Sequence, residues 1–182
     1  MIKKIISAAI IILLVFLFFI VYNKACKITY AHRLQNENTK VKKKMPLFEF
    51  EKLDGSIFTK YDLQKGKSTI IVYFDPDCGL CDKTGKFFNL FHKAYNNCGV
   101  LFISSNSNEL ILNYRERLEL GHIPNIEFLK CSPGQFYNFF KESNLPTYLI
   151  YDKNNELIKV INDDVPVSII LKYIKVAQDG SL

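Results

Sequence analysis

The sequence STIIVYFDPDCGLCDKTGKFF, residues 68–88, decides the fold of this chain. It begins with a nearly continuous apolar run, 68–74, which is typical of a strand buried on both faces of a sheet. A Cys-x-x-Cys motif, Cys78 and Cys81, follows this run and opens a segment with helical periodicity. We therefore predict a central strand that leads into a helix with both cysteines in its first turn.

Cysteines at this position and spacing suit reversible dithiol chemistry. Two intervening residues let both sulfurs meet within one helical turn, and the amides and partial positive charge of a helix N-terminus stabilise a thiolate. We predict Cys78 as the nucleophile and Cys81 as the resolving thiol. Half of a zinc site is the alternative, but a structural site needs four ligands, and the sequence contains no second C-x-x-C and no H-x-x-x-H. We predict no metal site.

The N-terminal 22 residues are the second informative segment. Two lysines precede an apolar run from Ile5 to Tyr22, which is just long enough for a helix to span a hydrocarbon core. We predict an uncleaved N-terminal transmembrane helix or signal segment over 1–22. A lipoprotein signal ending before Cys26 and a simply cleaved signal peptide are the alternatives.

Residues 23–45 are polar, rich in Asn and Lys and without apolar periodicity, so we predict a basic linker. Residues 1–45 carry a net charge of +8 and residues 46–182 a net charge of −2, which together give the +6 of the chain. The basic excess therefore belongs to the tether, which argues against nucleic-acid binding by the globular part. The lysines after the apolar run also count against export of the downstream domain.

The order of strand and helix patterns over residues 46–182 predicts one α/β domain. A β-hairpin spans 47–59 around Asp54-Gly55. Further strands are predicted at 68–74, 100–103, 126–129, 147–151 and 156–161, and helices at 81–96, 110–118, 133–142 and from Pro166 onward. This order implies a mixed sheet with helices on both faces. The aromatic residues of the third helix are expected in the core: Phe136, Tyr137, Phe139 and Phe140.

Four features carry a family resemblance. They are the hairpin opening at 46–55, the Cys78–Cys81 pair after the central strand, an inserted strand–helix segment at 121–144, and Leu145-Pro146-Thr147 before a strand. Over 46–176 the chain resembles the thioredoxin-like superfamily, in particular the membrane-anchored TlpA-like, or redoxin (AhpC/TSA-like), thiol–disulfide oxidoreductases.

The resemblance implies a three-layer α/β/α fold and a cis Leu145–Pro146 bond, with Pro146 beside the cysteine pair where it positions substrate backbone. It implies thiol–disulfide exchange with protein substrates, no bound cofactor, a thiol electron-donor protein as partner, and a monomeric domain. It also favours a single-pass protein of the cytoplasmic membrane whose domain faces the periplasm or cell exterior.

The chain departs from the family pattern around the cysteines. Asp77 stands where many members have Trp, and Val72 replaces the buried acid of thioredoxins. Three carboxylates, Asp75, Asp77 and Asp82, surround the pair and disfavour a thiolate, which makes the couple more reducing. We therefore expect a reductant, and Asp77 is the candidate proton acceptor for Cys81.

Two other functions stay open. A thiol peroxidase of the peroxiredoxin type carries Thr or Ser three residues before its reactive cysteine, where this chain has Asp75. A copper-binding thioredoxin-fold module would use Cys78 and Cys81 as soft ligands. Cys98 and Cys131 are expected to be buried free thiols rather than a second disulfide.

Overall fold

A computed structural model describes residues 43–162 and 164–180 of the chain. The predicted membrane segment 1–22 and the predicted linker up to residue 42 lie outside these residues. Within the described residues, no helix has both the length and the apolar character needed to cross a membrane.

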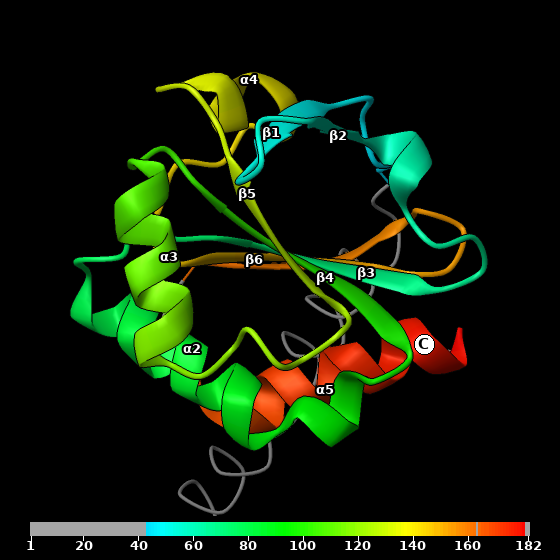
Figure 1. The fold of residues 1–182 in the computed structure, drawn as a ribbon. Helices are drawn as coiled ribbons and strands as arrows, with labels where there is room; N and C mark the ends of the chain where they lie inside the picture. The colour runs from blue at the N-terminus through cyan, green and yellow to red at the C-terminus, as the bar shows by residue number, and fades with distance from the viewer. Residues whose placement is uncertain (1–42, 163, 181–182) are drawn as a thin grey trace, which may run out of the picture. The chain divides into compact units, whose positions relative to one another are not determined.

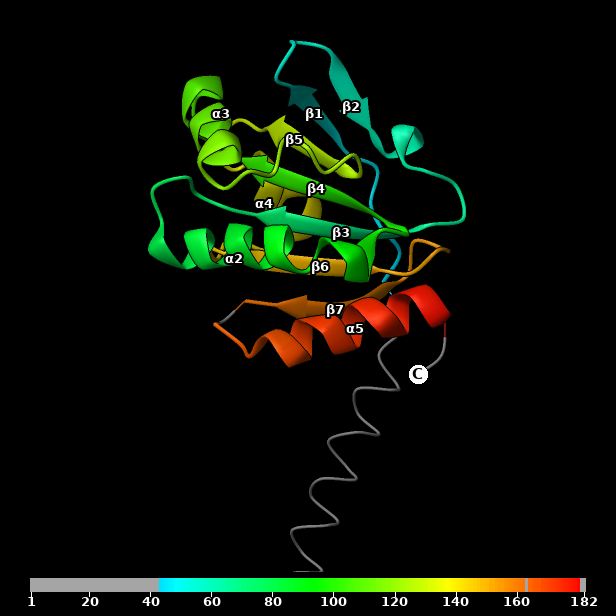
Figure 2. The same cartoon turned by 60° about the horizontal axis from the view of Figure 1, so that its bottom comes forward.

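A seven-stranded mixed sheet forms the middle of the domain. Its strands follow the spatial order β2-β1-β5-β4-β3-β6-β7, which Figure 2 shows from one edge to the other. The strands β3, β4 and β5 run parallel, and every other pairing is antiparallel. The bounds are β1 Glu49–Lys52, β2 Ile57–Thr59, β3 Ser68–Tyr73, β4 Cys98–Ser104, β5 Ile126–Lys130, β6 Thr147–Tyr151 and β7 Leu157–Ile161.

Helices cover both faces of this sheet, as the sequence predicts. Figures 1 and 2 show α2 and α5 on one face and α4 on the other, with α3 beside α2. The bounds are α2 Gly79–Leu90, α3 Asn108–Arg117, α4 Gln135–Phe140 and α5 Val167–Asp179, with short 3-10 helices η1 Lys60–Asp62 and η2 His92–Tyr95. The predicted inserted segment is therefore present as β5 and α4.

The central strand β3 contributes to the core on both faces. Ile70 and Val72 belong to the cluster under α2, α3 and α5, whereas Ile71 belongs to the cluster under α4. Successive side chains of a strand point to opposite faces, so a strand covered on both sides needs an apolar residue at every position. This confirms the interpretation of the run 68–74.

Two details differ from the sequence-based expectation. The helix predicted over 81–96 ends at Leu90, and η2 follows after Phe91. One local and one tertiary contact hold the chain after the break: the buried Tyr95 hydroxyl donates to the Phe88 carbonyl, and the Asn125 amide donates to the Tyr95 carbonyl at 2.9 Å. In α4, Tyr137 is 51% exposed rather than in the core.

The described chain begins at the end of the sheet that lies away from the cysteines. The Leu157 amide donates to the Lys43 carbonyl and the Met45 amide to the Asn155 carbonyl, both at 2.9 Å. These residues flank the β6–β7 turn, and β6 runs antiparallel to β3, so they lie near the start of β3. The cysteine motif follows the other end of β3.

Gly85 provides a test of the contact between α2 and α3. A Cβ atom at this position would overlap Leu118 Cδ1 and lie 2.7 Å from the Tyr114 hydroxyl. We expect Gly85→Ala to lower the free energy of unfolding by about 1–3 kcal/mol because overpacking forces the two helices apart. Gly99→Ala is the control, because its Cβ would meet nothing within 4 Å. Urea unfolding of both variants measures the difference, and equal stabilities would contradict the close approach.

Candidate active site

The strand-to-helix junction places the two cysteines in different environments. Cys78 is the N-cap of α2, with φ −89° and ψ 122°, and its carbonyl accepts the Asp82 amide at 3.0 Å. Cys78 is partly exposed, whereas Cys81 in the first turn is fully buried. The four described cysteines are all free of disulfides. This asymmetry fits an accessible nucleophile and a protected second thiol.

Burial holds the proton on Cys81. Desolvation raises the pKa of the Cys81 thiol to about 12. The Asp75 amide donates to the Cys81 sulfur at 3.4 Å, which works in the opposite direction, while the neighbouring Cys78 thiol and Asp75 carboxylate raise the pKa further. Cys81 therefore needs a proton acceptor before it can attack another sulfur.

Asp75 organises the loop between β3 and the cysteines. Its Oδ1 accepts the Asp77 amide at 2.9 Å and the Asn106 side-chain amide at 3.3 Å, and its carbonyl accepts the Cys78 amide at 3.1 Å. Asp75 is partly buried by these contacts, whereas Asp77 is exposed. Asp75 is thus the carboxylate whose charge acts on Cys81, which the sequence does not indicate. The sequence-based choice of Asp77 rests only on its being next to Cys78.

Sequence reasoning missed two residues of α3 that contact the motif. The buried Tyr114 hydroxyl donates to the Cys81 carbonyl at 2.5 Å, and burial raises the Tyr114 pKa. Arg117 donates to Asp82 Oδ2 at 2.6 Å and to the Pro76 carbonyl at 3.1 Å. Both lie more than thirty residues from the motif, and no spacing or composition signal links them to it.

Pro146 lies where the family resemblance implies. The Leu145–Pro146 bond is cis, and the following Thr147 pairs with Tyr73 at the end of β3. Because the loop to Cys78 leaves β3 at this same end, Pro146 is brought to the cysteine motif. Leu80, between the two cysteines, and Pro146 line one groove.

This groove has a volume of about 130 Å³ and a largely apolar lining. Its apolar side chains come from α2, the proline loop and the start of α5: Leu80, Phe87, Pro146, Val165, Val167 and Ile170. An exposed ion pair between Lys83 and Asp164, 2.7 Å long, lies at its rim. The groove can therefore accept an apolar side chain next to Leu80 and Pro146, although neither cysteine lines it.

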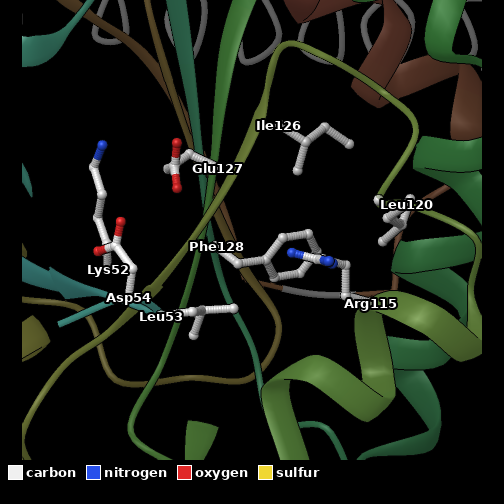
Figure 3. Close-up of a pocket in the computed structure, with 9 residues that line it drawn as sticks. Lys52, Leu53, Asp54, Arg115, Leu120, Ile126, Glu127 and Phe128 are labelled. Carbon is white, nitrogen blue, oxygen red and sulfur yellow. The ribbon is translucent and has the colours of Figure 1, made fainter. Parts of the chain in front are cut away.

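The larger cavity lies elsewhere. It measures about 340 Å³ and is lined by the end of β1, by β5 and by Arg115 of α3. Figure 3 shows Arg115 beside Phe128, with Lys52, Asp54 and Glu127 farther along its wall. Neither Cys78, Cys81 nor Pro146 lines it, so size alone does not locate the candidate active site.

The other described cysteines are separate from the motif and from each other. Cys98 belongs to the core cluster under α2 and α5, and Cys131 to the cluster under α4, on the opposite face of the sheet. Both are buried and free, and burial raises the pKa of Cys131 to about 11. The expectation of buried free thiols is confirmed for this pair. The described residues contain no group of three or more His, Cys, Asp or Glu side chains placed to hold a metal.

Comparison with known proteins identifies the fold. No family model and no curated protein sequence matches the chain. Among solved structures, a putative thiol:disulfide interchange protein DsbE from Chlorobium tepidum is similar with a TM-score of 0.64, at 15% identity over 75% of this chain and 96% of its own. A thioredoxin family thiol:disulfide interchange protein from the same organism gives 0.62, at 18% identity over 76% of this chain and 98% of its own.

A third similar structure is a secreted Mycobacterium tuberculosis disulfide oxidoreductase homologous to Escherichia coli DsbE. Its TM-score is 0.61, at 14% identity over 71% of this chain and 95% of its own. These likenesses show that the described domain has a thioredoxin-like fold, which confirms the fold that the resemblance implies.

The difference between the two thiols can be measured directly. We expect iodoacetamide to modify Cys78 at least about tenfold faster than Cys81 at pH 8, because Cys81 is buried and its pKa is raised to about 12. The tryptic peptide 68–83 holds both cysteines and no other, so fragmentation mass spectrometry locates the label. Buried Cys98 is the internal control for slow reaction. Equal rates at Cys78 and Cys81 would contradict their assignment.

Proposed function

We propose that the chain is a thiol–disulfide oxidoreductase that exchanges its Cys78–Cys81 pair with protein disulfides. The observation that carries the proposal is the partly exposed Cys78 at the start of α2, with the fully buried Cys81 in the same helical turn. Pro146 and the apolar groove that it lines support it, because they offer a surface for a substrate chain at the helix that carries both cysteines. The similar solved structures named as disulfide oxidoreductases also support it.

The exchange proceeds in two balanced steps. The Cys78 thiolate attacks one sulfur of the substrate disulfide, so a mixed disulfide forms and the other substrate sulfur leaves as a thiolate. Cys81 then loses its proton and attacks the Cys78 sulfur, which releases the second substrate thiolate. The substrate gains two electrons, and the chain keeps a Cys78–Cys81 disulfide. A separate dithiol protein returns two electrons for the next cycle.

We propose the reducing direction for this couple. The Asp75 charge and the burial of Cys81 disfavour the thiolate, and a less stable thiolate lowers the reduction potential. Asp77 adds a second carboxylate beside Cys78. Asp82, the third, is paired with Arg117, so it contributes less than the sequence suggests.

We also propose that the domain works outside the cytoplasmic membrane, tethered through residues 1–22. The support is the apolar run from Ile5 to Tyr22 in the sequence, together with a secreted protein among the similar structures.

The redox couple itself is the first test. The full chain is equilibrated with glutathione buffers, thiols are trapped, and the redox state of peptide 68–83 is read by mass spectrometry. We expect one two-electron couple, with a potential nearer to the about −270 mV of thioredoxin than to the about −120 mV of a strongly oxidising oxidase. Absence of any couple would overturn the proposed function, and a potential near −120 mV would overturn only its direction.

Substituting each cysteine separates their roles in the same assay. We expect Cys81→Ser to accumulate a stable mixed disulfide with a protein substrate, because the second attack is lost. Cys78→Ser should form none. Cys98→Ser is the matched control, because that thiol lies outside the motif.

The proton acceptor for Cys81 is tested by two isosteric changes. Asp75→Asn keeps the acceptor oxygen that binds the Asp77 amide, but it removes the charge that Cys81 feels. We expect it to slow resolution of the mixed disulfide by about tenfold to a hundredfold, and Asp77→Asn to slow it less. Single-turnover release of substrate thiol measures the step. The reverse order would give Asp77 the role that its position in the sequence predicts.

A further inference from the structure

Arg117 links the two segments that flank Cys78. From the last turn of α3, its Nη1 donates to Asp82 Oδ2 at 2.6 Å and its Nη2 donates to the Pro76 carbonyl at 3.1 Å. Pro76 lies in the loop before Cys78, and Asp82 directly follows Cys81. One guanidinium therefore holds both sides of the cysteine motif in place.

The guanidinium is itself held by its own helix. Its Cζ lies 5.7 Å from the centroid of the Tyr114 ring, one turn earlier in α3. The Tyr114 hydroxyl in turn binds the Cys81 carbonyl. Cation–π contact and hydrogen bonding together restrict a side chain that is 49% exposed and would otherwise be free to rotate.

Arg117 compensates the negative charge of Asp82. Its Oδ1 is buried and has no hydrogen-bond partner in the described structure, so Oδ2 carries the contacts of the carboxylate. Asp82 also occupies the first turn of α2, where it competes with a Cys78 thiolate for the positive end of the helix dipole. Without Arg117 an uncompensated negative charge would stand beside the thiols.

We propose that Arg117 is a positioning residue that raises the reduction potential of the Cys78–Cys81 couple by neutralising Asp82 and holding the Pro76 carbonyl. This inference rests on the proposed exchange function. Reduction by two electrons places negative charge on Cys78 whenever the thiolate forms, whereas the disulfide carries none. A nearby positive charge therefore favours the reduced state, and a nearby uncompensated carboxylate favours the disulfide.

The expected effects have opposite signs for the two partners. Arg117→Ala should lower the equilibrium constant for reduction by glutathione by about two- to fivefold, the range for a partly exposed charge pair. Fivefold corresponds to about 20 mV for a two-electron couple. Arg117→Lys should retain part of the effect because it keeps the charge. Asp82→Asn should raise the constant, because it removes the carboxylate that disfavours a thiolate at the start of α2.

The double variant tests whether Arg117 acts through Asp82. In the Asp82→Asn background, Arg117→Ala should lower the constant by less than it does in the unsubstituted chain. Lys86→Ala is the charge-matched control, because Lys86 is an exposed cation of α2 farther from the motif, and it should change the constant by less than about twofold. All variants are assayed as full chains, and mass spectrometry of peptide 68–83 gives their redox state.

A purely structural role predicts a different result. It would lower the unfolding temperature of the oxidised and reduced forms equally and leave the potential unchanged. An unshifted potential in Arg117→Ala, or an equal shift with and without Asp82, would overturn the inference while the proposed function stands. Absence of any couple in the unsubstituted chain would overturn both.

Discussion

The junction between β3 and α2 is the constraint on which the rest of this domain depends. β3 is buried from Ser68 to Val72, so the chain must leave the sheet at its end and cover the exposed apolar face with the next helix. Phe87 and Phe88 anchor α2 on that face. The N-terminus of α2 is thereby fixed near the carboxyl end of β3, and Cys78 with it.

The same junction creates two unlike thiols from one short motif. The N-cap position leaves Cys78 partly open to solvent, and the helical turn carries Cys81 under Tyr114 into the core. Burial disfavours the charged form of a thiol, so the pKa of Cys81 rises while the helix terminus acts mainly on the residue that caps it. The partly exposed thiol and the buried thiol are thus separated by position in one helical turn.

The three carboxylates near the motif have different partners, so counting their charges does not describe the environment of the thiols. Asp75 uses one carboxylate oxygen to bind the Asp77 and Asn106 amides, and Asp82 is paired with Arg117. Only Asp77 of the three is exposed. The chemical environment of the thiols therefore depends on which of these carboxylates is compensated, and that depends on α3.

Much of the fold could be predicted because its signals are local. The run that forms β3 has apolar residues on both faces, and the strand after Pro146 follows a similar pattern. Asp54-Gly55 marks the hairpin turn. Helix ends were less accessible to prediction. The helix from Gly79 ends at Leu90, and the backbone near this end is held by a local bond from Tyr95 and by Asn125, which is distant in sequence.

The sequence by itself determined the central strand and the cysteine pair at a helix start, because each depends on neighbouring residues, while the family resemblance implied the cis Leu145–Pro146 bond. Only the tertiary structure decided which thiol is buried and by how much, which carboxylate approaches Cys81, and that Tyr114 and Arg117 reach the motif from α3. The physical reason is that desolvation and charge pairing depend on distances through space, and a chain segment thirty residues away can set them only after the sheet has brought it near.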